Sequence, residues 1–511
     1  MSGNTETVAP EAELIYGIDD IPPTKEVLAL GFQHYLTMFG STVAIPLLMA
    51  KPLGLDDKPV ELGWLIATMF FVSGITTLLQ TTWGNRLPIV QGGTFSFLAP
   101  AFAICGMALA ADGNYEVKLQ HIQGAVILGA VFEIAIGVTG LAGKMLRYIG
   151  PITIAPTIAL IGLCLFKFGA PVAGSHWPIG GLTIFLIILF SQYLRTKARA
   201  FELYPILLAI VLAWAVTAIC TVAGLFPEGH PSHASLANLE AAPWFRVPMP
   251  FQWGTPIFGV AAFVGMLAGY LASMVESIGD YYACARMSGA PQPTASTVNR
   301  GITFEGIGCA VAGVFGTGNG TTSYSENIGA IGLTRVGSRR VVQAGAILMI
   351  VLGLVSKFGA LFTTIPLPIV GGMYCAMFGM IASVGLSNLQ FINLNSARNL
   401  FIVGFAFFMG LSVPEYFTQD FCSDADGKLQ FLISNGSGVV PALADAKFQC
   451  IEILYPRFDM APDWLNNMLS TIGKTGMAVG ALIAIILDNT IPGTDEERGI
   501  AAWRAGQEDA S

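Results

Sequence analysis

Apolar stretches long enough to cross a bilayer as a helix, about 20 residues each, recur along the whole chain. Only 11% of the 511 residues are charged and 54% are hydrophobic, so the chain lacks the polar surface that a soluble protein needs. We count about fourteen such stretches, several of them joined by very short turns. The sequence therefore predicts an all-α membrane protein with fourteen transmembrane segments, embedded in membrane lipid.

Basic residues indicate how the segments are oriented. The clusters at 195–199 and 335–340 fall on the same side of the membrane when the N-terminus is placed inside. Because cytoplasmic loops are enriched in Lys and Arg, both termini are expected in the cytoplasm, and the protein in the plasma membrane. Residues 1–24 are polar and acidic without a secretory signal, so we expect a disordered cytoplasmic tail, with a second tail at 491–511.

The predicted segments divide evenly into two halves. The first half covers 25–225, and an outer loop at 226–254 leads to the second half at 255–490, which includes a long outer loop at 414–461. Each half holds an odd number of segments, so the second half must be inverted relative to the first. That topology is typical of inverted-repeat transporters.

Two segments in equivalent positions of the halves begin with unusual polar stretches. The third segment opens with Val90–Leu98 (VQGGTFSFL), and the tenth opens with Thr321–Asn327 (TTSYSEN). Both stretches are expected to be extended and to lead into a short helix. Irregular backbone at membrane depth persists only where protein or a polar cavity satisfies its hydrogen bonds. The matched pair therefore predicts a binding site near the bilayer midplane, with the positive ends of two short helices directed at it.

Ionisable residues inside the segments are candidates for that site. Glu276 and Asp280 are four residues apart, which places both carboxylates on one face of the eighth segment. Gln33 and His34 form a polar pair in the first segment, either structural or part of a proton-coupled machine. Glu305 is expected to pair with Arg300, and Glu133 is either a relay acid or faces a helix partner.

Sequence motifs for enzymatic or metal chemistry are not found. Gly316–Gly320 (GTGNG) lacks the lysine of a phosphate loop, and no zinc-protease, serine-hydrolase or kinase motif occurs. The 8 cysteines form no CxxC pair. We therefore expect no enzyme, no cofactor, no metal and no nucleic-acid partner. Cys422 and Cys450 share the long outer loop, where a disulfide is chemically possible.

Several motifs together resemble those of the nucleobase-ascorbate transporter family over about residues 22–505. Residues 326–335 (ENIGAIGLTR) match the family signature, and Gln33-His34 resembles its first-segment motif. Val275–Arg286, Gly337–Gln343 and Asp488–Gly493 are similar to the animal ascorbate carriers of the family. The resemblance implies a substrate-carrying core of segments 1–4 and 8–11. It also implies a gate of segments 5–7 and 12–14, through which the protein would form a homodimer.

The resemblance also implies roles for single residues. Glu276 and Glu326 would hold the substrate ring, and Phe95 would offer a backbone amide. The neighbours of Glu326, Ser325 and Asn327, are further candidate substrate-binding residues. His34 and Asp280, with Gln33, would couple transport to a cation. Bacterial uracil permeases have a histidine at the position of Asp280, so the coupling ion, H⁺ or Na⁺, stays open.

The first residue of the signature bears on the substrate. Animal ascorbate carriers have proline where this chain has Glu326. Two carboxylates would repel the ascorbate anion, whereas uracil or xanthine presents N–H donors that a carboxylate accepts. We therefore predict import of a neutral nucleobase, uracil or a xanthine-type purine, most simply by proton symport. The alternatives are a sodium-dependent ascorbate symporter and, from another class, a channel or anion exchanger.

Overall fold

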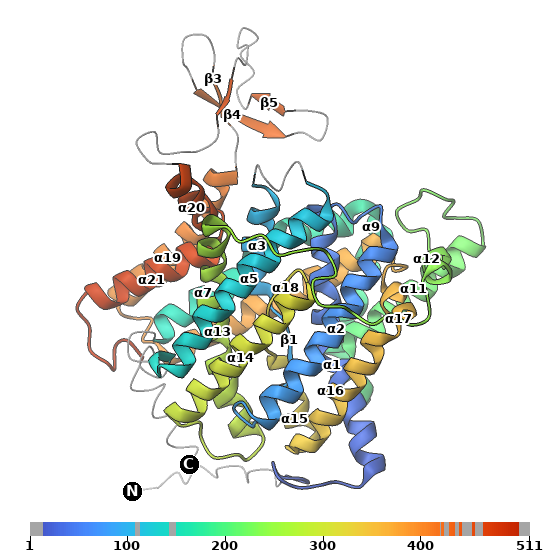
Figure 1. The fold of residues 1–511 in the computed structure, drawn as a ribbon, viewed down its shortest axis with the longest axis horizontal. Helices are drawn as coiled ribbons and strands as arrows, with labels where there is room; N and C mark the ends of the chain where they lie inside the picture. The colour runs from blue at the N-terminus through green and yellow to red at the C-terminus, as the bar shows by residue number, and fades with distance from the viewer. Residues whose placement is uncertain are drawn as a thin grey trace, which may run out of the picture.

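The computed structural model describes residues 14–107, 113–142, 150–418, 421–423, 429–434, 439–441, 452–454 and 463–499. Long helices form most of the molecule (Figure 1). The first half contains α1 (Thr24–Leu53), α2 (Pro59–Thr82), β1 (Gln91–Gly93), η1 (Phe95–Phe97), α3 (Leu98–Cys105), α5 (Tyr115–Val138), α7 (Pro151–Leu163), η2 (Phe166–Phe168), α8 (Ala170–Ala173), η3 (Gly174–His176), α9 (Trp177–Ile188), η4 (Leu189–Tyr193), α10 (Arg199–Leu203) and α11 (Pro205–Val222).

The second half, taken together with the loop before it, repeats the pattern of long helices around one short buried strand and adds four short strands late in the chain. It contains α12 (Ala237–Ala241), α13 (Val260–Met287), α14 (Ala295–Phe315), β2 (Thr321–Ser323), α15 (Ser325–Thr334), α16 (Arg339–Leu354), α17 (Ser356–Phe362), α18 (Leu367–Ser387), η5 (Asn388–Phe391), α19 (Ala397–Thr418), β3 (Phe421–Ser423), β4 (Leu429–Ser434), β5 (Val439–Pro441), β6 (Glu452–Leu454), α20 (Asp463–Gly473) and α21 (Gly476–Thr490).

Eight helical spans in the described part of the chain are long and apolar enough to cross a membrane. The helical class of the prediction is thus confirmed, whereas the count of fourteen segments stays a prediction. Six of the fourteen expected segments are therefore not among these eight, and three of the six are explained as follows. Residues 151–193 count as one apolar span of 43 residues, although they contain the two expected segments as separate helices, α7 and α9. The third and tenth segments are short helices, because each begins as a strand.

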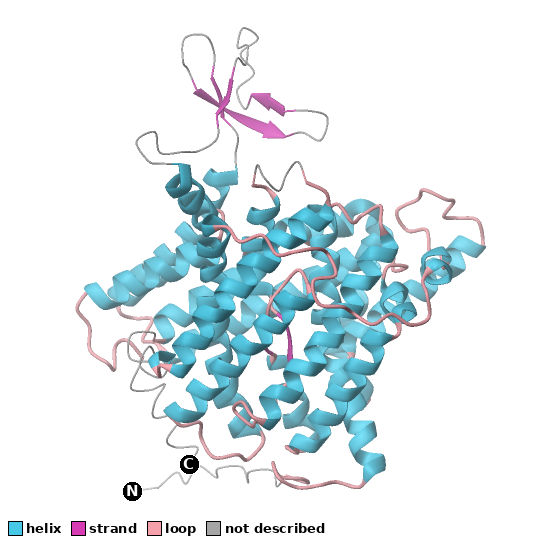
Figure 2. Ribbon diagram, in the orientation of Figure 1, coloured by secondary structure: helices cyan, strands magenta, loops and turns pink. Residues whose placement is uncertain are grey.

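Strands β1 and β2 pair antiparallel in the middle of the helical body (Figures 1 and 2). Gln91 lies opposite Ser323 and Gly93 opposite Thr321, and every residue of both strands is buried. Gly92 permits this packing, since a Cβ there would lie 2.6 Å from the Tyr324 ring. The predicted extended stretches are therefore present, and each satisfies the backbone of the other, as buried polar backbone requires.

Glycines allow several helix pairs to pack at close range. A Cβ on Gly306 of α14 would lie 2.9 Å from the backbone nitrogen of Ile134 on α5. Gly353 of α16 faces α2 in the same way, and Gly162 of α7 faces α18. Small residues at such seams let backbones approach closely, which is the usual basis of helix association in a membrane.

The long loop between α19 and α20 is not wholly irregular. Strands β3 to β6 form an antiparallel sheet in the order β5-β4-β3-β6, separate from the helical body in Figure 2. The expectation of an all-α chain is corrected here, because residues such as Phe421 and Phe431 pair across neighbouring strands. The possible disulfide between Cys422 and Cys450 involves residue 450, which lies outside the described residues.

Candidate functional site

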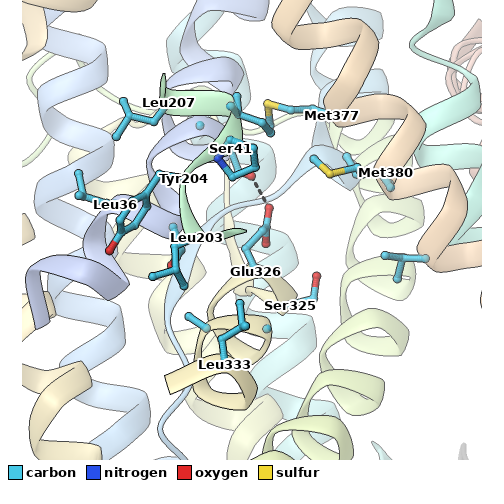
Figure 3. A pocket seen from close by; sticks show the side chains of 18 of the residues that line it. Leu36, Ser41, Leu203, Tyr204, Leu207, Ser325, Glu326, Leu333, Met377 and Met380 are labelled. Atoms are coloured by element: carbon cyan, nitrogen blue, oxygen red, sulfur yellow. Dashed lines mark hydrogen bonds between the residues drawn. The ribbon is translucent and has the colours of Figure 1, made fainter. Parts of the chain in front are cut away.

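A cavity of about 390 Å³ lies where α1, α13 and α15 face α10, α11 and α18 (Figure 3). Its walls are largely apolar and include Leu36, Leu203, Leu207, Leu333, Met377 and Met380. A few polar side chains also line it: Thr37, Ser41, Glu202, Tyr204, Glu276, Ser325 and Glu326. Of the three carboxylates, Glu202 forms an ion pair with Arg195 at 3.5 Å. An apolar cleft of this size with a few polar groups is typical of a small-molecule site.

Glu276 and Asp280 extend from one face of α13, as their spacing predicts. Both line a second cavity of about 280 Å³. The two cavities share Glu276 and Ser325 and are therefore adjacent. Asp280 is 8% exposed, and its Oδ2 atom has no hydrogen-bond partner. The second cavity extends to Arg286 at the end of α13 and to Gln390 in η5.

Glu326 lies in the first turn of α15 and is open to the larger cavity. The Ser41 hydroxyl of α1 donates a hydrogen bond to Glu326 Oε1 (Figure 3). This bond joins the two halves of the chain and orients the carboxylate. Sequence analysis missed Ser41. It lies seven residues after His34 on the same helix, but no local pattern shows that it meets α15, 285 positions away in the chain.

The other predicted substrate residues differ in their positions. Ser325 is the first residue of α15 and lines both cavities. Asn327 is fully buried and holds backbone instead: its Oδ1 accepts from the Val90 amide at 3.0 Å, and its Nδ2 donates to the Pro88 carbonyl at 2.9 Å. Phe95 begins η1 beside the cavities, with its ring centroid 6.0 Å from that of Phe378 on α18. Neither Asn327 nor Phe95 is among the residues that line these two cavities.

Gln33 and His34 lie outside both cavities. His34 is 2% exposed, and its Nδ1 has no hydrogen-bond partner. Gln33 Nε2 is likewise buried and unpartnered. Asp280 lines the smaller cavity, so the three residues predicted to couple a cation do not share one cavity in this structure.

The expected pairing of Glu305 with Arg300 is wrong. Arg300 is exposed, whereas Glu305 is 1% exposed and accepts hydrogen bonds from Ser273 Oγ and Tyr281 OH, each at 3.0 Å. Both donors lie on α13, which sequence spacing alone could not bring to α14. Within the described residues, no three His, Cys, Asp or Glu side chains are grouped so as to hold a metal ion.

Comparison with known proteins decides the family. The sequence profile of the Permease family matches residues 25–419. Solute carrier family 23 member 2 of Rattus norvegicus is 45% identical, over 98% of this chain and 78% of the relative. Nucleobase-ascorbate transporter 1 of Arabidopsis thaliana is 38% identical, over 96% of this chain and 92% of the relative. The chain belongs to the nucleobase-ascorbate transporter family. It is therefore a multi-pass membrane transporter, and the family is not one of enzymes.

Solved structures of two distantly related sequences share the fold. The transmembrane domain of the cyanobacterial bicarbonate transporter BicA aligns with a TM-score of 0.52 at 15% identity, over 77% of this chain and 97% of that domain. The structure of SLC26A9 aligns with a TM-score of 0.54 at 12% identity, over 76% of this chain and 63% of that protein. At such low identity these likenesses concern the fold alone. The profile match covers every site residue named above in this nucleobase-ascorbate transporter.

Proposed function

We propose that this transporter imports a neutral nucleobase, uracil or a xanthine-type purine, by proton symport. The observation that carries the proposal is that Glu276 and Glu326 enter one cavity from two different helices. No Lys, Arg or His is among the residues that line this larger cavity. The site thus offers hydrogen-bond acceptors without a cation to balance an anionic ligand.

The chemistry of the ligand follows from these acceptors. Uracil and xanthine carry N–H groups beside carbonyl oxygens, and a carboxylate accepts such N–H groups in charge-assisted bonds, about twice as strong as neutral ones. The amides at the start of α15, beside Ser325, are donors for a ligand carbonyl. The apolar walls from α11 and α18 complement the faces of a flat ring.

Transport would proceed by movement of a core against a gate. The cavities lie between elements of the predicted core, α1, α13 and α15, and elements of the predicted gate, α7, α11 and α18. In the predicted orientation the ends of α13 and α18 face the cytoplasm, so this state would be open to the inside. Fourteen segments, a gate-mediated homodimer and location in the plasma membrane are parts of the same proposal.

A sodium-dependent ascorbate symporter is the second candidate. Arg286 favours it, because this guanidinium lines the far end of the smaller cavity and could attract an anion. The name of the Arabidopsis relative covers both substrate classes. The two candidates differ in ligand charge and in driving ion.

Uptake into proteoliposomes tests the proposal. Uracil, xanthine and ascorbate are offered separately, with the pH gradient and the sodium gradient imposed one at a time. We expect nucleobase accumulation driven by the pH gradient. Glu276→Gln and Glu326→Gln should each reduce it about tenfold or more, since each loses a hydrogen bond to a charged group. Glu228→Gln, an exposed outer-loop control, should transport like the parent. Saturable ascorbate uptake that needs sodium and ignores excess uracil would refute the proposal.

A further inference from the structure

A second site of acidic residues lies next to strand β2, and its residues line neither cavity. Glu133 of α5 is fully buried, and neither of its carboxyl oxygens has a hydrogen-bond partner. It lies in the seam between α5 and α14, where Gly306 approaches the backbone of Ala130 and Ile134. The titratable groups that act on it are Glu305 and the thiol of Cys309, both on α14.

Glu305, unlike Glu133, is surrounded by hydrogen-bond donors. Ser273 Oγ and Tyr281 OH both donate to its carboxylate at 3.0 Å. Thr322 Oγ1 and Ser323 Oγ of β2 lie at 3.5 Å as further donors. Several donors stabilise an ionised carboxylate, and a carboxyl group without donors is stable in a dry interior only when it is neutral.

No positive charge balances this pair. The groups that face it from the neighbouring elements are neutral or acidic: Gln80 of α2, Cys309 of α14, and Tyr270, Tyr281, Glu276 and Asp280 of α13. No Lys or Arg forms an ion pair with Glu133 or Glu305 in the part of the chain that the structure describes. Two buried carboxylates that act on each other without a balancing cation would repel strongly if both were ionised, so the pair must hold at least one proton.

We propose that Glu133 and Glu305 form a proton-binding site of the transporter, in which Glu133 carries the proton while the hydroxyl donors hold Glu305 ionised. This inference rests on the proposed function. It adds a second binding site for the coupling ion. The ligand of the site is a proton taken from water. Its residues are distinct from the substrate-binding carboxylates.

Hydrogen bonds connect this site to the substrate cavity. Ser277 follows Glu276 on α13; its Oγ is 3.1 Å from Thr322 Oγ1 and accepts from the Ser323 amide at 3.2 Å. A ligand that moves Glu276 or the start of α15 thus shifts the donors of Glu305. With the donors in place the pair holds one proton. When the donors of α13 and β2 are displaced from Glu305, this residue binds a second proton from the aqueous phase, so proton uptake is linked to substrate binding.

Infrared spectroscopy of the purified protein, without substrate, tests the site directly. The carbonyl stretch of a protonated carboxylic acid is separate from the bands of a carboxylate. Glu133→Gln should remove one such band, and the exposed control Glu228→Gln should remove none. Glu133→Asp should keep a band at a shifted position. An unchanged band in Glu133→Gln overturns the proposal, as does loss of the band in Glu305→Gln with Glu133 intact.

Transport measurements test the link to coupling, with whichever of uracil, xanthine or ascorbate the parent accumulates. Glu133→Gln should bind and exchange substrate within about threefold of the parent but lose about tenfold or more of its pH-driven accumulation. Glu133→Asp should restore it. Parent-like accumulation in Glu133→Gln overturns the coupling role. If the parent follows only a sodium gradient, the proposed function fails in its coupling ion, whereas the infrared result still decides the proton on Glu133.

Discussion

At the scale of single residues, the Ser41–Glu326 bond makes one half of the chain orient an acid of the other half. The bond from Ser41 orients the Glu326 carboxylate, which lines the cavity where a ligand N–H would meet it. Thr37 lines the same cavity one turn earlier, but its hydroxyl donates to the His34 carbonyl of its own helix at 2.8 Å. Two hydroxyls of one cavity therefore have different tasks.

Replacing Ser41 tests this difference. Ser41→Ala leaves Glu326 without its orienting donor, so the KM for substrate should rise about fivefold to tenfold, corresponding to about 1 kcal/mol. The matched variant Thr37→Ala should leave KM nearly unchanged, because it loses only a local bond on α1. Uptake kinetics of purified, reconstituted protein give both values. Equal effects of the two substitutions would contradict an orienting role for Ser41.

Gly329 shows how a missing side chain shapes the cavity. It lines the larger cavity, and a Cβ built on it meets no atom within 4 Å. The glycine is therefore not required by packing, and a side chain there would occupy ligand space. Gly329→Ala should leave the melting temperature within about 2 °C of the parent. It should weaken the binding of a two-ring purine about tenfold more than the binding of one-ring uracil. Competition of each base against labelled substrate measures this ratio, and equal weakening of both bases would contradict the argument.

At the scale of elements, two asparagines position the pair of broken segments. Asn319 precedes β2, and its Oδ1 accepts from the Thr94 amide at 3.0 Å. Asn327 follows β2 and holds Val90 and Pro88 before β1. Each asparagine of the second half thus binds backbone of the first half, which fixes the short helices relative to one another.

Loss of the Asn327 hydrogen bonds to the backbone before β1 should therefore destabilise the site indirectly. Asn327→Ala leaves the Val90 amide and the Pro88 carbonyl buried and unpaired, at a cost of about 1–3 kcal/mol each. We expect a lower melting temperature and weaker substrate binding together. Asn327→Asp keeps the acceptor for Val90 and should lose less stability. Weaker binding with unchanged stability in Asn327→Ala would instead favour a direct ligand role.

Features that depend on local residue spacing can be predicted from the sequence, whereas contacts between residues far apart in the chain cannot. The broken segments, the shared face of Glu276 and Asp280 and the position of Glu326 follow from residue spacing, and the structure agrees with them. The pairing of β1 with β2, the Ser41 bond and the bracing by Asn327 join residues more than 200 positions apart. The expected pairing of Glu305 with Arg300 is wrong for the same reason. The donors of Glu305 lie on α13 and β2, and its sequence neighbour Arg300 is at the surface.

At the scale of the whole molecule, close packing divides the helices into groups. Glycine seams join α2 to α16 and α5 to α14, all within the predicted core, and α7 to α18 within the predicted gate. The cavities instead lie along the boundary between the groups. Phe102 of α3 and Phe168 of η2 meet across this boundary, with ring centroids 5.1 Å apart. Phe71 of α2 and Phe315 of α14 meet inside the core at 5.5 Å.

Crosslinking of these two aromatic pairs tests whether the core slides against the gate. All 8 native cysteines are first replaced by alanine. Phe102 and Phe168 are then changed to cysteine in the test variant. Phe71 and Phe315 are changed to cysteine in the matched control. A reducible crosslinker in the first pair joins core to gate, so transport should fall about tenfold or more and return on reduction. The same crosslink in the second pair joins two helices of one rigid group and should leave transport nearly intact. Full transport after complete crosslinking of Phe102→Cys to Phe168→Cys would mean that this boundary does not move, and substrate would have to pass through a local gate beside α15.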